Sequence, residues 1–161
     1  MMWEFGFSRM PSLDWHPLST PSPEMVYRTL ENAAVTRLYP GFDAWFLTKV
    51  VPGVRNGERR IVTSVTNGKL SGVAICKRSA SEAKLCTMWV SPPARGCGIA
   101  AKLASEAFKW LGTNKPLFTV PEERLSEFQN LLRAWAFTDH IEYPGLYRAN
   151  RVEHVFNERR A

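Results

Sequence analysis

The sequence lacks the features that mark disulfide-rich and membrane-spanning proteins. Its 161 residues include only three cysteines, an odd and sparse set that argues against a disulfide framework and for a reducing compartment. No apolar run approaches the roughly 20 residues that a membrane-spanning helix needs. The N-terminal stretch MMWEFGFSRM also lacks the apolar core of a secretory signal. We therefore expect a cytoplasmic protein with no membrane partner.

Histidine is equally scarce, and its positions do not suggest a metal site. His16, His140 and His154 are far apart in the chain, so no zinc-ligand spacing is present and no metal is expected. Lys and Arg outnumber Asp and Glu by 21 to 15, which indicates an anionic partner such as a phosphate-bearing cofactor or nucleic acid. The basic clusters at 55–60 and 157–161 have no interleaved aromatic residues. For these clusters a solvated surface is therefore favoured over a nucleic-acid site.

What the chain does have is a succession of helical and strand patterns typical of one α+β domain. Residues 1–23 are rich in proline and are expected to form an extended arm, with one short strand around Leu13 to Leu18. Residues 24–161 are expected to form a single domain. Its expected elements, in chain order, are helices at 23–37 and 43–50, strands at 59–66, 69–77 and 83–90, a helix at 99–111, a strand at 116–120, a helix from 121, and strands at 138–143 and 147–156.

The segment Arg95-Gly96-Cys97-Gly98-Ile99-Ala100 lies between an expected strand and an expected helix. Backbone N–H groups of such a loop can point into one concavity, and the helix N-terminus adds unsatisfied donors and its positive dipole end. A side chain at position 96 or 98 would crowd a bound phosphate, which explains the two glycines. GxxxxGK[ST] is absent, so a P-loop is excluded. GxGxxG is absent too, and the preceding strands are expected to form antiparallel hairpins instead of a βαβ unit, which excludes a dinucleotide-binding fold. We interpret the segment as a diphosphate cradle, with a plain tight turn as the alternative.

This segment, V-S-P-x-x-R-G-x-G-I-A-x-x-L, resembles the acyl-CoA-binding motif Q/R-x-x-G-x-G/A of the GNAT N-acetyltransferases. Arg95, Gly98 and Ala100 fill its defined positions, and the element order over about residues 24–156 is similar to that fold. The resemblance implies a mixed, mostly antiparallel sheet with helices on both faces and acetyl-CoA as cofactor. The pyrophosphate would lie on the loop, and the pantetheine arm would follow a strand backbone where two strands separate. The cofactor-binding residues so implied are Met88, Trp89, Val90, Arg95, Gly96, Cys97, Gly98, Ile99 and Ala100.

The catalytic residues are less well defined than the loop. The family often carries a tyrosine on the helix after its fifth strand, and the matching position here is Leu132. A coenzyme A thiol should titrate near a free cysteine, at a pKa of about 8.5, so the thiolate can leave with help only from water. The candidate bases for the attacking amine are Glu122, Glu123 and His140. The alternatives are that the two acids support a helix dipole and that the histidine is an ordinary polar residue of a strand.

We therefore predict an N-acetyltransferase that moves an acetyl group from acetyl-CoA to an amine acceptor, a small molecule or a protein, in a ternary complex. Two alternatives stay open: a tRNA- or nucleic-acid-directed, toxin-like acetyltransferase, and a non-catalytic CoA-binding or interaction module. The two N-terminal helices, with Tyr39, Trp45 and Phe46, are expected to build the acceptor site, although core packing also explains these aromatic residues. The acceptor's identity and the oligomeric state stay open, with a homodimer among the options.

Overall fold

The computed structural model describes residues 21–33 and 35–158. The strand expected around Leu13 to Leu18, and nearly all of the expected arm, lie outside the described residues. Within the described ranges no helix is both long enough and apolar enough to cross a bilayer.

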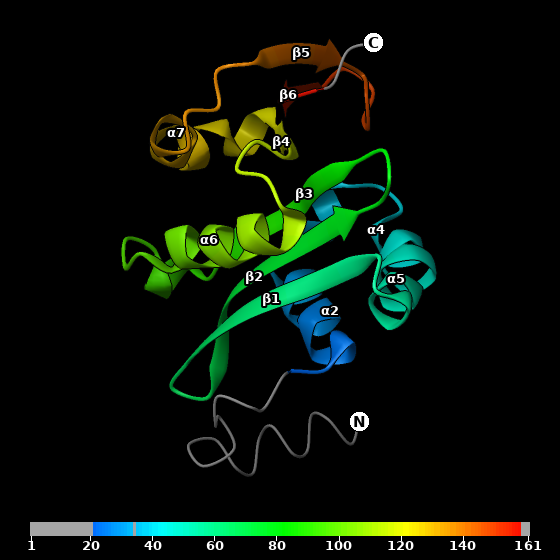
Figure 1. Cartoon of the computed structure of the whole chain (residues 1–161), viewed down its shortest axis with the longest axis vertical. Helices are drawn as coiled ribbons and strands as arrows, with labels where there is room; N and C mark the ends of the chain where they lie inside the picture. The colour runs from blue at the N-terminus through cyan, green and yellow to red at the C-terminus, as the bar shows by residue number, and fades with distance from the viewer. Residues whose placement is uncertain (1–20, 34, 159–161) are drawn as a thin grey trace.

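The described residues form a six-stranded sheet in the order β1-β2-β3-β4-β6-β5 (Figure 1). Its strands are β1 (Arg59–Thr66), β2 (Lys69–Arg78), β3 (Ala83–Val90), β4 (Leu117–Pro121), β5 (His140–Pro144) and β6 (Val152–Phe156). All neighbouring strands are antiparallel except β3 and β4, which run parallel. This mixed, mostly antiparallel sheet confirms the predicted α+β class.

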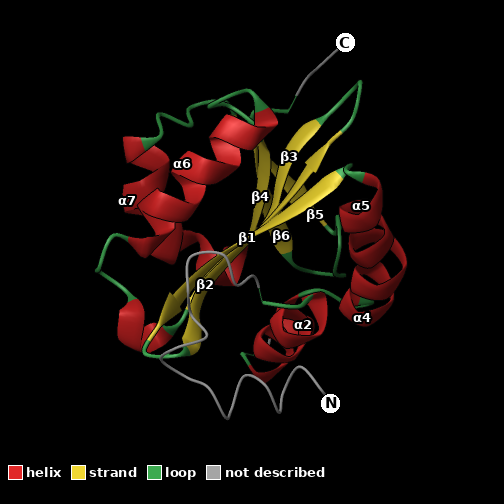
Figure 2. Cartoon of the chain, turned by 60° about the horizontal axis from the view of Figure 1, so that its bottom comes forward, coloured by secondary structure: helices red, strands yellow, loops and turns green. Residues whose placement is uncertain are grey.

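Helices cover both faces of the sheet, as Figure 2 shows. One face carries α6 (Ile99–Leu111) and α7 (Leu125–Ala134), which follow the short 3-10 turns η2 (Pro92–Ala94) and η3 (Glu122–Arg124). The other face carries the N-terminal helices, which are α2 (Pro23–Asn32), α3 (Val35–Leu38), α4 (Phe42–Trp45), the π-helical turn η1 (Phe46–Val50) and α5 (Val51–Asn56).

The strand alternation supplies apolar side chains to both layers. Ala74 and Cys76 of β2 pack in the core cluster under α6 and α7, whereas Val73 and Ile75 pack in the cluster under α2 and η1. All four side chains are fully buried. A strand that is covered on both faces needs such a nearly continuous apolar run, and the sequence of β2 provides it.

Several local signals in the sequence have the predicted outcome. Asn67 and Gly68 join β1 to β2 with φ values of 52° and 76°, the left-handed conformation of a two-residue hairpin turn. Gly112 ends α6 with a φ of 74°. The strand predicted at 83–90 has the bounds of β3.

The element bounds that differ most from the prediction are three. The helix expected over 23–37 ends at Asn32, and α3 is a separate turn. The helix expected at 43–50 continues past Pro52 to Asn56, because Pro52 lies in the first turn of α5, where a missing N–H costs little, and follows the wide π-turn η1. The last strand begins at Val152 instead of residue 147, because residues 145–151 form a loop in which Asn150 has a φ of 61°.

Candidate active site

The strands β3 and β4 separate along their length, and the separation opens a gap in the sheet. The two strands are paired only at Lys84 with Leu117 and at Leu85 with Phe118. Beyond these pairs β3 runs on to Val90, and no further residues of β3 and β4 are paired within the described chain. Backbone groups at the end of β3 are therefore not occupied by β4.

On the side of α6 and α7, the gap opens into a cavity of about 380 Å³, which we call the helix-side cavity. The end of β3, the loop before α6, the first turn of α6 and one side of α7 line it. Among the residues predicted to bind the cofactor, seven line this cavity: Met88, Val90, Arg95, Gly96, Gly98, Ile99 and Ala100. Cys97 is exposed in the loop, while the side chain of Trp89 is 7% exposed and packs in the core under α2.

The loop before α6 offers a row of unused backbone donors. Gly96 and Gly98 both have a φ of 80°, a conformation that favours glycine, and a Cβ added at either would meet no atom within 4 Å. Within residues 21–33 and 35–158, none of the backbone N–H groups of residues 96–101 donates a hydrogen bond. These donors lie at the N-terminus of the 13-residue helix α6, whose dipole favours an anion there. The loop therefore has the open space and the donors that a diphosphate requires.

Two arginines bind the backbone of β3 at the mouth of this cavity. Arg124 donates from Nη2 to the Met88 carbonyl oxygen at 3.1 Å, and Arg95 donates from Nε to the Val90 carbonyl oxygen at 3.3 Å. Both arginines also form an ion pair with Glu127. A cofactor arm that pairs with Met88 would meet Arg124, which the sequence reasoning missed. The sequence feature that could have identified Arg124 is a cation at the start of a helix, where the helix dipole disfavours positive charge.

A second cavity, of about 260 Å³, lies beyond the gap, and we call it the aromatic cavity. Tyr39, Phe42, Trp45 and Tyr147 are its aromatic lining residues, and Phe46 is a core residue instead. A small space of about 10 Å³, which we call the constriction, lies between the two cavities. It shares three lining residues with the helix-side cavity (Met88, Arg124 and Phe128) and four with the aromatic cavity (Tyr39, Cys86, Thr87 and Thr119). The two cavities therefore approach each other at the gap in the sheet.

A buried carboxyl group adjoins the aromatic cavity. Glu153 of β6 is 3% exposed, and its Oε2 accepts a hydrogen bond from the Tyr39 hydroxyl at 3.1 Å. Burial raises the pKa of the Glu153 carboxyl, although hydrogen bonds from Tyr39 and Thr119 act in the opposite direction. Burial and the neighbouring Glu153 together raise the pKa of the Tyr39 phenol. Tyr39 therefore stays protonated, and its hydroxyl connects the cavity to a carboxylate.

The two acids that the sequence offered as bases lie at η3, and both are engaged. Glu123 forms a bidentate ion pair with Arg148, with both N–O distances at 2.6 Å. The hydrogen bonds from Arg148 lower the pKa of Glu123 to about 2. Glu122 accepts a hydrogen bond from the Val152 backbone N–H at 2.9 Å. Glu123 thus ties η3 to the loop between β5 and β6, and Glu122 ties it to the first residue of β6. Neither side chain lines the aromatic cavity.

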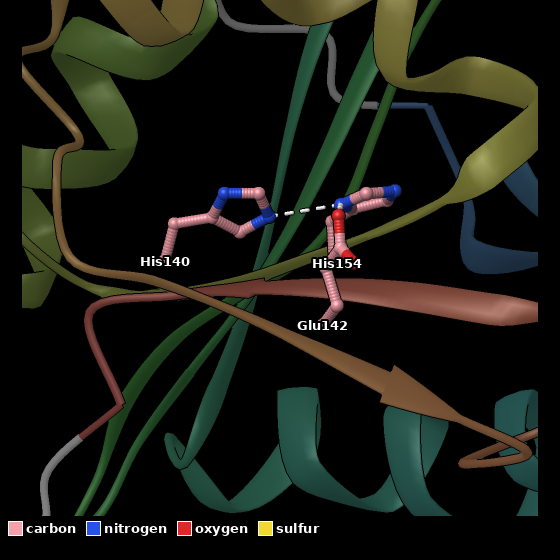
Figure 3. Close-up of side chains that lie close together, drawn as sticks. All are labelled: His140, Glu142 and His154. Carbon is pink, nitrogen blue, oxygen red and sulfur yellow. Dashed lines mark hydrogen bonds and ion pairs between the residues drawn. The ribbon is translucent and has the colours of Figure 1, made fainter.

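The third candidate, His140, is paired with another histidine (Figure 3). His140 Nε2 lies 2.8 Å from His154 Nδ1, and the His140 ring stacks on Phe156. Burial, followed by the proximity of His140, lowers the pKa of His154. Neither histidine lines the aromatic cavity. Leu132, at the position of the usual tyrosine, is buried in the core under α6 and α7.

Comparisons with known proteins agree with this geometry. The sequence model of the acetyltransferase (GNAT) family matches residues 15–124. No curated protein has a sequence significantly similar to this chain. Solved structures with similar folds include a GNAT-family acetyltransferase from Desulfovibrio desulfuricans (TM-score 0.66, 14% identity, covering 84% of this chain and 90% of that one). The ribosomal-protein-S18-alanine N-acetyltransferase from Escherichia coli is also similar (TM-score 0.62, 16% identity, 86% and 88% covered). A third is the PaiA N-acetyltransferase from Thermoplasma acidophilum in complex with coenzyme A (TM-score 0.56, 16% identity, 83% and 93% covered).

Proposed function

The chain belongs to the acetyltransferase (GNAT) family, which uses acetyl-CoA, and we propose that it acetylates an amine by direct attack in a ternary complex. The observation that carries this proposal is the pair of cavities that meet through the gap between β3 and β4. The helix-side cavity would hold the cofactor and the aromatic cavity the acceptor. Two reactants held on opposite sides of one constriction need no covalent enzyme intermediate, because their reacting atoms meet there.

The helix-side cavity has the groups that the cofactor needs. When bound, acetyl-CoA supplies the acetyl group as a thioester. The backbone N–H groups of residues 96–101 would hold its pyrophosphate, since no other group in the described chain uses them. The backbone of Met88 to Val90 would hold the pantetheine arm. A backbone N–H near Val90 would polarise the thioester carbonyl, as in an oxyanion hole.

We assign the proton transfer to the Tyr39–Glu153 pair. The attacking amine must lose one proton. Tyr39 lines both the aromatic cavity and the constriction, and its hydroxyl is hydrogen-bonded to the carboxyl group of Glu153. As Tyr39 takes this proton, it passes its own hydroxyl proton along the 3.1 Å hydrogen bond to Glu153, so that Tyr39 stays neutral and Glu153 becomes protonated. Glu123 is less suited to this role, because its ion pair with Arg148 lowers its pKa to about 2.

The departure of the thiol needs no dedicated acid in this proposal. Leu132 is a buried apolar residue and cannot donate a proton. A thiolate with a pKa of about 8.5 is a good leaving group near neutral pH and can take its proton from solvent.

Turnover assays with labelled acetyl-CoA and a panel of amines test this function. We expect transfer by the wild-type protein and a large loss in both Tyr39→Phe and Glu153→Gln. The comparison variants are Glu122→Gln, Glu123→Gln and His140→Asn. A loss of turnover confined to one of them would assign the general base to that residue instead. Cofactor binding without transfer to any amine would favour a non-catalytic module, and transfer to tRNA with strong salt dependence would favour a nucleic-acid-directed enzyme.

A further inference from the structure

A cluster of polar side chains lies outside both cavities, on the strand pair β5 and β6 (Figure 3). His140 and Glu142 are two residues apart on β5, so their side chains point to the same face of the sheet. His154 of β6 lies directly opposite Glu142 in the antiparallel register. The fold thus brings together two histidines that are 14 residues apart in the sequence. Their separation along the chain, from which no metal site was expected, is not a separation in space.

We propose that His140, Glu142 and His154 bind one divalent transition-metal ion, with zinc as the expected ion. One ligand atom from each of the three residues lies within 4.8 Å of the other two. His140 Nε2 and His154 Nδ1 are 2.8 Å apart, and Glu142 Oε1 lies 3.8 Å from His154 Nδ1. Three potential ligand atoms of the types that zinc prefers therefore already surround one point.

Small side-chain movements would complete the coordination geometry. Zinc binds imidazole nitrogen at about 2.0–2.1 Å, so two nitrogens on a tetrahedral zinc lie about 3.3 Å apart. The two histidine nitrogens would have to move apart by only a fraction of an ångström. The two strands hold the histidines firmly, because His154 is 7% exposed and His140 stacks on Phe156 with a centroid distance of 4.5 Å. The Glu142 side chain is 64% exposed and free to approach the ion.

The ligand set decides which ions fit. Two imidazoles and one carboxylate suit zinc, nickel, cobalt or copper, whereas magnesium and calcium prefer sets made of oxygen only. Because Glu142 and His140 are exposed, the fourth position would face solvent and hold water. The ion would join the edge strand β5 to β6, whose residue Glu153 directly precedes His154. We therefore assign it the role of bracing the strand that carries Glu153, on the opposite face from that side chain.

Calorimetric titration of chelator-treated protein with zinc chloride tests the site directly. We expect saturable binding of one ion per chain, a visible absorption band with cobalt that reports the coordination, and a zinc-dependent rise in the melting temperature. Magnesium chloride should produce none of these effects. Absence of saturable zinc binding would overturn the proposal, and the pair of histidines would then be a plain hydrogen-bonded contact.

Three variants identify the ligands. His140→Ala should weaken zinc binding by roughly tenfold or more, since even outer-shell substitutions cost metal sites about that much. Glu142→Gln should weaken it less, because the amide oxygen can still contact the ion. Cys97→Ser is the matched control, because it removes an exposed potential metal ligand that is not part of the cluster, and it should leave zinc binding unchanged. The melting temperature of metal-free His140→Ala shows whether the variant is folded. If folded His140→Ala binds zinc like the wild type, or if Cys97→Ser abolishes binding, the proposed ligands are wrong.

Discussion

The helix-side cavity and the aromatic cavity are built from different parts of the chain. The first presents backbone N–H groups from one contiguous loop, residues 96–101. The second presents side chains from distant segments, with Tyr39 from the N-terminal region, Trp45 from α4 and Tyr147 from the loop before β6. Backbone N–H groups suit a ligand whose diphosphate never varies. A cavity lined by side chains can change its specificity through single substitutions. We therefore expect that cofactor affinity and proton transfer can be impaired separately.

The largest expected effect is a loss of turnover, caused by a substitution beside the aromatic cavity. Glu153→Gln removes the final proton acceptor and should lower kcat by about 10²- to 10⁴-fold, the usual range for a lost general base. Its dissociation constant for acetyl-CoA should change little, because Glu153 does not line the helix-side cavity. Glu123→Gln is the control, an equally conservative change in a carboxylate paired with Arg148. A Glu153→Gln protein with normal kcat would remove the proposed proton path.

The pH dependence of this activity has a definite sign. Burial raises the pKa of Glu153, and only its ionised form can accept the proton. The wild-type rate should therefore rise with pH through the pKa of Glu153, and Glu153→Gln should lack this limb of the kcat profile. A profile that keeps the same limb in Glu153→Gln would assign the titration to another group.

The next largest effect should be a loss of affinity for acetyl-CoA, caused by a substitution in the loop that lines the helix-side cavity. Gly98→Val puts a β-branched side chain at a φ of 80° and into the open space before α6, where the diphosphate would lie. Each lost charge-assisted contact is worth about 1.5–3 kcal/mol, so acetyl-CoA affinity should fall by about 100-fold or more. The backbone strain should cost about 1–2 kcal/mol of unfolding free energy.

Gly112→Val is the matched control for this change. Gly112 caps the other end of α6 with a φ of 74°, and a Cβ there also meets no atom within 4 Å. The two variants should lose similar thermal stability, but only Gly98→Val should lose affinity in calorimetric titrations. Equal affinities in the two variants would contradict the cradle.

The contrast between the cavities also explains what could be predicted from the sequence. The residues of the loop at 95–100 are contiguous, so their spacing alone was enough to predict a cofactor site there. The Tyr39–Glu153 hydrogen bond joins residues 114 positions apart, which only the folding of the chain brings together. Glu122 and Glu123 follow β4 directly and were offered for that reason, but Arg148 and the Val152 N–H, both remote in sequence, already bind them.

A smaller effect should come from the packing that positions the cradle. Gly72 of β2 lies under α6, where an added Cβ would be 2.7 Å from Ile99 Cγ2 and 2.8 Å from Leu103 Cδ1. Gly72→Ala should therefore cost about 1–3 kcal/mol of unfolding free energy, as overpacked cores do. Because α6 must shift, a weaker affinity for acetyl-CoA should accompany the lower melting temperature. An unchanged melting temperature would show that α6 can move away without cost.

The smallest effect should come from the ion pair at η3. Glu123 is partly exposed, so Glu123→Gln should cost less than about 1 kcal/mol. The pKa of Glu123 is about 2 in the folded protein, below its value of about 4.3 in an unfolded chain. Its contribution to stability is therefore complete above about pH 4.3 and is lost as the pH falls toward 2. The melting temperatures of the wild type and Glu123→Gln should differ near neutral pH and converge in strong acid. A difference that stays constant with pH would contradict the lowered pKa of Glu123.

The backbone amide resonances of the labelled protein, followed during titration with coenzyme A, give the most direct test of where the cofactor binds. The account predicts that the largest shifts occur at residues 96–101, where free N–H groups would acquire phosphate acceptors, with further shifts at Met88 to Val90. Amides of β5, which contribute to neither cavity, should hardly change. Saturable binding with its largest shifts outside residues 88–101 would contradict the assignment of the helix-side cavity to the cofactor.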